Sequence, residues 1–238
     1  MATCIEFRPS PSTSLFDSLS VVGRALFTNK TAVALHLIKS GQPFPLLEDR
    51  WHILALAIQN CPNLELIDEM IKSLNIKQIN TIDPENFSPL IMAAQERNVP
   101  IIDRLIKAGA EVYLKNGFGN TALHHIMLYH PTSDNTPNSR LETVKCLLSH
   151  GASVDETDSW AKTPLTLYIE SQQSDPNIIH LLVAHGATPP TIKMRNPHAV
   201  TINAAIQTGL QQRRTEVTTT LTPHFSTSNL LALINEYV

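Results

Sequence analysis

The feature that most limits the fold of this chain is an apolar segment that occurs three times. The copies are Ser88–Ala94 (SPLIMAA), Thr121–Met127 (TALHHIM) and Thr163–Ile169 (TPLTLYI). A second apolar run follows each copy and ends at a glycine, namely Gly109, Gly151 or Gly186. Repetition at a fixed period of about 20–50 residues indicates a solenoid, in which units stack because none of them buries its apolar face alone.

The spacing of the copies locates an insertion. The first interval is 121 − 88 = 33 residues and the second is 163 − 121 = 42 residues. The nine extra residues, 130–138, are polar, include two prolines and fall between the two apolar runs of one repeat. They predict an inserted loop between two helices, which we place at residues 130–140.

The residue types at the ends of each segment predict a pair of helices in every repeat. Ser88 or Thr163 can cap the free amides of a first helix, and the proline that follows fits the first helical turn. The glycine after the second apolar run is typical of a helix that ends in a left-handed conformation.

The motifs resemble those of the ankyrin repeat family. Asn116–His124 (NGFGNTALH) matches the family's opening pattern, as do Asp83–Leu90 and Asp158–Leu165. In the place of the family's glycine, Asn86 is a tolerated residue, whereas Ala161 is harder to accommodate, so we expect its turn to differ. The resemblance implies an all-α ankyrin-repeat solenoid of stacked helix-turn-helix units with short turns and divergent capping repeats.

The same matches, extended outward, predict the domain organisation. Residues 1–14 form a flexible leader, and residues 15–238 form a single ankyrin-repeat domain. Its parts are a divergent N-terminal repeat (15–47), a further repeat (48–82), three motif-bearing repeats (83–115, 116–157 with the inserted loop, and 158–190) and C-terminal capping helices (191–238, with helices at 199–206 and 229–238).

Composition and charge argue against several classes of protein. Of the 238 residues 42% are hydrophobic, and 18 basic against 21 acidic residues give a net charge of −3 with no basic block. The lack of a basic block argues against nucleic-acid binding. No window approaches 18 consecutive apolar residues, so we expect no membrane partner. Three widely spaced cysteines predict reduced thiols in a cytoplasmic environment, and the N-terminus shows no signal-peptide pattern. We also expect a monomer without cofactors.

The histidines and cysteines are interpreted as structural. His124 stands in the histidine place of the ankyrin motif, where the resemblance implies a hydrogen bond to the turn. His150 and His185 precede helix-ending glycines, a position that favours contacts with helix carbonyls. No carboxylate stands near a histidine at metal-ligand spacing in the sequence, and Cys146 falls within an apolar helical stripe. We therefore expect no catalytic residue, no metal site and no enzyme.

The resemblance also implies where a partner protein binds, because ankyrin proteins use their turn tips and the exposed face of the first helices as a concave groove. Exposed aromatics with a few charges are typical of interface anchors. The predicted partner-binding residues are Trp160, Phe118, Tyr129, Lys115, Asn120, Lys162, Phe87, Glu85, Glu96 and Glu170.

Three alternatives concern the partner. Capture could lie in the inserted loop 130–140. The C-terminal segment from Leu221 onward faintly resembles the start of an F-box, which would make the chain a substrate adaptor of a ubiquitin ligase through its C-terminal helix. The degenerate repeats and many Asn and Thr residues resemble effectors that intracellular bacteria secrete into host cells, in which case the partner is a host protein.

Overall fold

The computed structural model describes residues 19–48, 51–128, 137–171, 175–190 and 199–221 of the chain. The chain divides into two compact units, Met1–Ala152 and Ser153–Val238, here called the N-terminal and the C-terminal unit. The predicted leader lies outside the described residues. The single domain predicted for residues 15–238 and its repeat boundaries stay predictions.

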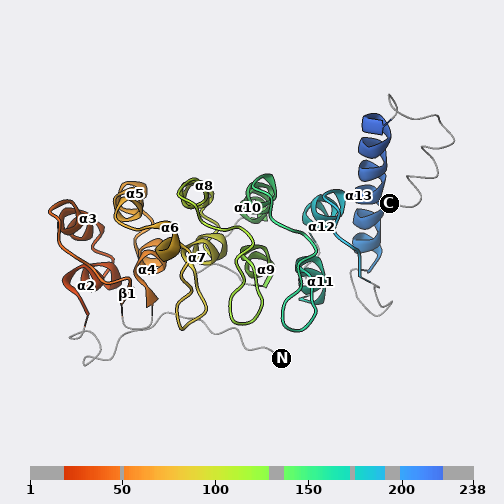
Figure 1. Cartoon of the computed structure of the whole chain (residues 1–238). Coiled ribbons are helices and arrows are strands. Elements are labelled where there is room, and N and C mark those ends of the chain that lie inside the picture. Colours follow the sequence, from red (N-terminus) through yellow and green to blue (C-terminus); the bar gives the residue numbers. More distant parts are fainter. Residues whose placement is uncertain (1–18, 49–50, 129–136, 172–174, 191–198, 222–238) are drawn as a thin grey trace. The chain divides into compact units, whose positions relative to one another are not determined.

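The N-terminal unit consists of stacked helix pairs. Figure 1 shows that the second helices of the pairs form one layer and the first helices the other. A short helix, α6 (Ile76–Ile79), and two antiparallel two-residue strands, β1 (Leu47–Glu48) and β2 (Trp51–His52), lie between pairs. The pairs are α2 (Val21–Phe27) with α3 (Thr31–Lys39), α4 (Ile53–Asn60) with α5 (Leu64–Lys72), α7 (Pro89–Gln95) with α8 (Val99–Lys107), and α9 (Ala122–Leu128) with α10 (Pro137–Ser149).

The C-terminal unit contains one further pair and a long helix. The pair is α11 (Pro164–Glu170) with α12 (Pro176–Ala184), and α13 (Ala199–Leu221) packs along α12. At Gly209 a Cβ atom would lie 2.8 Å from the Val183 Cβ and 2.9 Å from the His180 carbonyl oxygen. Glycine is therefore the residue that lets α13 approach α12 this closely.

Capping residues explain where the helices begin. The Ser88 Oγ accepts a hydrogen bond from the Ile91 amide at 3.2 Å, and the Thr163 Oγ1 accepts one from the Thr166 amide at the same distance. Both caps are followed by a proline in the first helical turn, where its missing N–H leaves no bond unmade. The first helices thus begin where the repeated motif predicts them, and the all-α ankyrin solenoid is confirmed.

Aliphatic side chains fill the space between the helices. Leu, Ile, Val and Ala residues of both layers dominate the buried set, as the low aromatic content indicates. A row of rings adds to this core in the N-terminal unit: Phe87 stacks on Trp51 with ring centroids 6.4 Å apart, and the His125 ring lies 5.6 Å from Phe87. Neighbouring repeats are therefore joined by ring contacts as well as by helix packing.

Two predicted boundaries differ in the structure. Helix α10 begins at Pro137, so residues 137–140 of the predicted loop are helical, because proline is well suited to a first helical turn. Helix α13 runs on to Leu221, well beyond the short helix predicted at 199–206. Residues 130–136 and the helix predicted at 229–238 lie outside the described residues.

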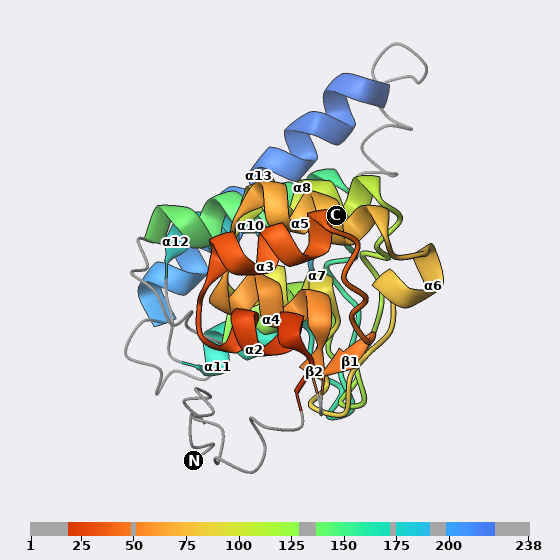
Figure 2. The ribbon, with the colours of Figure 1, turned by 90° about the vertical axis from the view of Figure 1, so that its left-hand side faces the viewer.

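Within the N-terminal unit, the two helix layers lie one over the other, and β1 and β2 lie to one side of them (Figure 2). Among the residues that the structure describes, no helix combines the length and the apolar character needed to cross a bilayer.

Candidate functional site

Three five-residue turns, 83–87 and 116–120 in the N-terminal unit and 158–162 in the C-terminal unit, lead into α7, α9 and α11. In each, the first residue donates its amide to the carbonyl of the fifth, at 2.9, 3.0 and 3.0 Å. The fourth residue donates its amide to the carbonyl of the first, at 2.9, 2.8 and 3.1 Å. The three turns therefore share one backbone conformation.

The side chain of the first residue stabilises each turn by accepting hydrogen bonds from two backbone amides of the same turn. The Asp83 Oδ1 accepts hydrogen bonds from the third and fifth amides of its turn, at 3.1 and 2.8 Å. The Asn116 Oδ1 does the same at 3.0 and 3.0 Å, and the Asp158 Oδ1 at 2.8 and 2.8 Å. An oxygen with two amide donors fixes the backbone locally, so the turns form rigid supports for their exposed residues.

The fourth residue of every turn is left-handed, with a φ of 68° at Asn86, 75° at Gly119 and 57° at Ala161. Our expectation that the turn at Ala161 differs is wrong. A left-handed alanine costs about 1–2 kcal/mol, whereas the two Asp158 bonds and the two backbone bonds of the turn together contribute more than that. The hydrogen bonds therefore decide the conformation.

The third residue of each turn varies in chemistry. It is Glu85 in the first turn, Phe118 in the second and Trp160 in the third. Phe118 is 48% exposed and Trp160 is 63% exposed, which is unusual for large apolar side chains. Tyr113, which is 66% exposed just before the second turn, is an aromatic that the motif alignment missed because it precedes the motif.

The other predicted partner-binding residues fall into several environments. Phe87 is half-buried in its stack on Trp51, and Asn120 is buried, so both offer little surface. Glu85 and Glu96 are half-buried, and Lys115 is exposed. Lys162 forms an ion pair with Glu170. Tyr129 lies outside the described residues.

The buried histidines of α9 are structural. The His124 Nδ1 lies 2.9 Å from the Thr121 Oγ1 and accepts a hydrogen bond from the Thr121 amide, so its predicted contact with the turn is present. The Asn116 Oδ1 accepts hydrogen bonds from two amides of the turn, so the Nδ2 is the atom of Asn116 that faces His125. It donates a hydrogen bond to the His125 Nε2 at 3.1 Å. Burial lowers the pKa of His125 to about 3.

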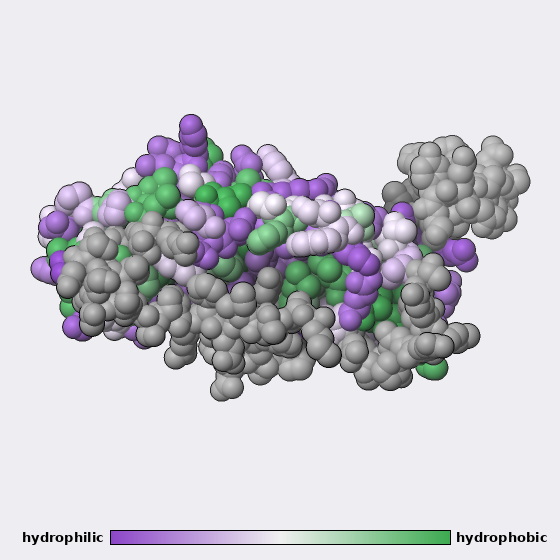
Figure 3. All heavy atoms as spheres, turned by 90° about the horizontal axis from the view of Figure 1, so that it is seen from below, coloured by the Kyte–Doolittle hydropathy of each residue, from purple (hydrophilic) through white to green (hydrophobic). Residues whose placement is uncertain are grey.

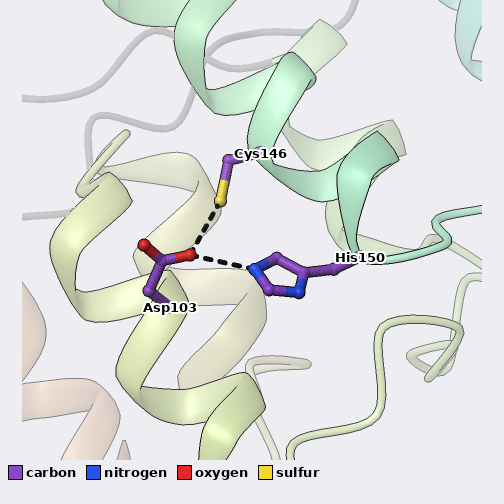
Figure 4. Close-up of side chains that lie close together, drawn as sticks. All are labelled: Asp103, Cys146 and His150. Atoms are coloured by element: carbon purple, nitrogen blue, oxygen red, sulfur yellow. Dashed lines mark hydrogen bonds and ion pairs between the residues drawn. The ribbon is translucent and has the colours of Figure 1, made fainter.

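His185 and His150 occupy equivalent places before their glycines, yet they make different contacts. The His185 Nδ1 lies 2.8 Å from the Leu181 carbonyl, which is the predicted contact with a helix end. The His150 Nε2 instead lies 2.9 Å from the Asp103 Oδ1 (Figure 4). A carboxylate from the preceding repeat therefore does accompany a histidine in space, although none stands near it in the sequence.

Cys146 completes a cluster with this pair. Its Sγ donates to the same Asp103 oxygen at 3.4 Å. Burial and the neighbouring carboxylate raise the pKa of the Cys146 thiol to about 12, and the His150 hydrogen bond lowers the pKa of Asp103. The one sequence signal for this cluster is the spacing of Cys146 and His150 by four residues, which places them on one helix face.

On the face seen from below, hydrophobicity alone does not mark a binding surface among the described residues. From below, hydrophobic and hydrophilic residues alternate in small patches over the described surface (Figure 3). Transient interfaces are about as apolar as the rest of a protein surface and depend on a few anchor residues. The exposed turn aromatics are therefore the best candidates for contact.

Comparison with known proteins agrees with the fold. Residues 85–117 and 118–159 match the family described as Ankyrin repeat, so this part of the chain carries ankyrin repeats. It is 25% identical over 154 residues to the potassium channel AKT2/3 of Arabidopsis thaliana, an alignment that covers 56% of this chain and 19% of the channel. The chain thus spans about a fifth of that relative's length. Ankyrin repeats are non-catalytic protein-interaction modules.

Proposed function

We propose that this chain is a non-enzymatic scaffold that binds a partner protein through the turns preceding α9 and α11. The observation that carries the proposal is the exposure of Phe118 and Trp160 at the same place of two hydrogen-bonded turns. A rigid support lowers the entropy lost when an aromatic side chain is immobilised in a complex, so these two residues are suited to act as anchors.

The charges around the turns add specificity to this contact. Lys115 is exposed beside the second turn, and Lys162 pairs with Glu170 at the third. A partner with acidic groups next to an apolar pocket would complement the Phe118 ring and the positive charge of Lys115 at the second turn. An exposed aromatic ring on a rigid turn is typical of the anchors of a protein interface.

The test is capture of partners from a eukaryotic lysate by the full chain and by a Phe118→Ala, Trp160→Ala double variant. Truncating an anchor typically weakens binding by about 2 kcal/mol or more, so the double variant should retain less than a tenth of the captured protein. Val33→Ala is the matched control, because Val33 is 48% exposed on α3 and belongs to none of the three turns.

A folded double variant that captures as much partner as the wild type would contradict the proposal. Deletion of residues 130–136 tests the inserted loop in the same assay, since loss of capture there alone would assign binding to the loop. Truncation after Leu221 tests the ubiquitin-ligase adaptor in the same way.

We further propose that the chain acts in the cytoplasm and, if it is a secreted effector, in the cytoplasm of a host cell. Support comes from the sparse, widely spaced cysteines and from the degenerate repeats. Capture from a eukaryotic lysate but not from a bacterial lysate is the result expected of an effector.

A further inference from the structure

Three potential metal ligands from two neighbouring repeats meet at one point in the N-terminal unit. Asp103 belongs to α8, Cys146 belongs to α10, and His150 follows the end of α10 (Figure 4). Their donor atoms all lie within 4.8 Å of one another. The two helices pack against each other, so the ligands are held by the stacking of the repeats and not by a loose loop.

The two distances from the Asp103 oxygen to the other donor atoms are close to those of a tetrahedral zinc site. Zinc bonds of about 2.0–2.3 Å place a sulfur and an oxygen ligand about 3.5 Å apart and a nitrogen and an oxygen ligand about 3.3 Å apart. The observed distances from the Asp103 Oδ1 are 3.4 Å to the Cys146 Sγ and 2.9 Å to the His150 Nε2. Movements of a few tenths of an ångström would bring both distances from the Asp103 oxygen to the values of a zinc site.

The types of ligand also select the metal. A thiolate, an imidazole and a carboxylate suit zinc better than magnesium or calcium, which prefer oxygen ligands. We propose that Asp103, Cys146 and His150 bind a zinc-class divalent ion with three protein ligands and a water molecule in the fourth position. When the ion binds, the thiol proton of Cys146 leaves to solvent and the sulfur bonds to the metal.

The neighbouring repeat provides a natural comparison. His185 stands in the place of His150, but Leu181 stands in the place of Cys146. His185 accordingly contacts a backbone carbonyl, as a histidine without other ligands does at a helix end. The site therefore depends on a cysteine and a carboxylate that this second histidine lacks.

The positive charge of a neighbouring lysine should weaken the binding of a metal ion. Lys107 lies one helical turn after Asp103 on α8 and interacts with its carboxylate. Removing this charge should tighten metal binding, whereas removing a ligand should weaken it. The two effects have opposite signs, which separates a metal site from a cluster that serves stability alone.

The experiment is a titration of the metal-free full chain with Co²⁺, followed by the thiolate-to-cobalt charge-transfer absorption in the near ultraviolet. One equivalent should produce the band, and Zn²⁺ should displace it. Cys146→Ser should abolish the band. His150→Gln and Asp103→Asn should each weaken binding by about 10- to 100-fold or more, since even residues that only support the ligands have effects of that size.

Matched controls use the other thiols and the other histidine. Cys61→Ser, Cys4→Ser and His185→Gln should leave the cobalt band unchanged, and Lys107→Gln should tighten binding. A band that persists in Cys146→Ser, or no band in the wild type at millimolar Co²⁺, would overturn the proposal.

A second measurement needs no variant. Zinc should slow alkylation of Cys146 by iodoacetamide at least tenfold in the native wild-type chain, with the modified residue identified by mass spectrometry. Equal alkylation rates of Cys146 with and without zinc would also overturn the proposal.

Discussion

The turns that precede α9 and α11 have the same backbone conformation but a different residue at each of their five positions. Asn116 stands at the first place of one turn and Asp158 at the first place of the other, and the left-handed residue is Gly119 in one and Ala161 in the other. The Asn116 Nδ2 also donates to the Asn86 carbonyl at 3.2 Å and to His125, whereas a carboxylate has no such donor. An amide oxygen and a carboxylate oxygen at the first place therefore stabilise the same turn conformation.

The largest difference expected between the two turns is their response to acid. His125 is buried against Asn116 with a pKa of about 3, while Leu167 stands in its place in the next repeat. Between an unfolded pKa of about 6.5 and this folded value, the unfolded chain binds more protons, so stability is lost as pH falls. The N-terminal unit should lose about 1.4 kcal/mol per pH unit, or about 3 kcal/mol by pH 4.

Urea denaturation of a Trp160→Phe variant measures this effect, because Trp51 then reports on the N-terminal unit. The lowered pKa of His52 adds to the slope in the same direction. His125→Leu, which copies the next repeat, should therefore flatten the pH dependence of the unfolding free energy without removing it. An unchanged slope in that variant would show that His125 is not the group responsible.

The next largest effect concerns the acceptor oxygen. Asp158→Ala removes the partner of the Trp160 and Lys162 amides and should destabilise the C-terminal unit by about 2 kcal/mol. Asp158→Asn keeps the acceptor, as Asn116 does, and should change stability by less than about 0.5 kcal/mol. A Trp51→Phe background makes Trp160 the reporter in both variants. Equal losses for the two substitutions would mean that the charge, and not the acceptor, holds the turn.

The smallest effect is expected from exchanging the left-handed residues. Ala161→Gly relieves the left-handed alanine and should stabilise the C-terminal unit by about 0.5–1 kcal/mol, after allowing for the greater flexibility of glycine in the unfolded chain. Gly119→Ala should destabilise the N-terminal unit by a similar amount. Denaturation midpoints of each variant check the pair, and a destabilising Ala161→Gly would contradict the explanation given for that turn.

The sequence predicted the helices well because their signals are local. Ser88 and Thr163 cap helices that begin at the next residue, and Asn86 adopts the left-handed conformation expected of it. The sequence did not predict the turn at Ala161, because a preference of one residue was outweighed by hydrogen bonds spread over five. It also could not show that α13 continues to Leu221, since packing against α12 extends that helix beyond its apolar segment.

The same distinction between local signals and contacts made by packing applies to the candidate sites. Phe118 and Trp160 could be selected from the motif, because the third place of each turn follows from the alignment. The exposure of Tyr113 could not, since it precedes the motif. Asp103 and His150 are 47 residues apart, and their contact requires α8 and α10 to be stacked. Contacts between residues of different repeats therefore cannot be predicted from this sequence alone, whereas the position of a residue within its repeat can.

The central claim is that the third residue of these turns contacts a partner protein. A photo-crosslinking phenylalanine analogue at position 118 or 160 of the full chain tests it directly. At either position it should crosslink the same partner, and at the exposed positions 33 and 200 it should not. Equal crosslinking at all four positions, or crosslinking at 33 and 200 alone, would contradict the account.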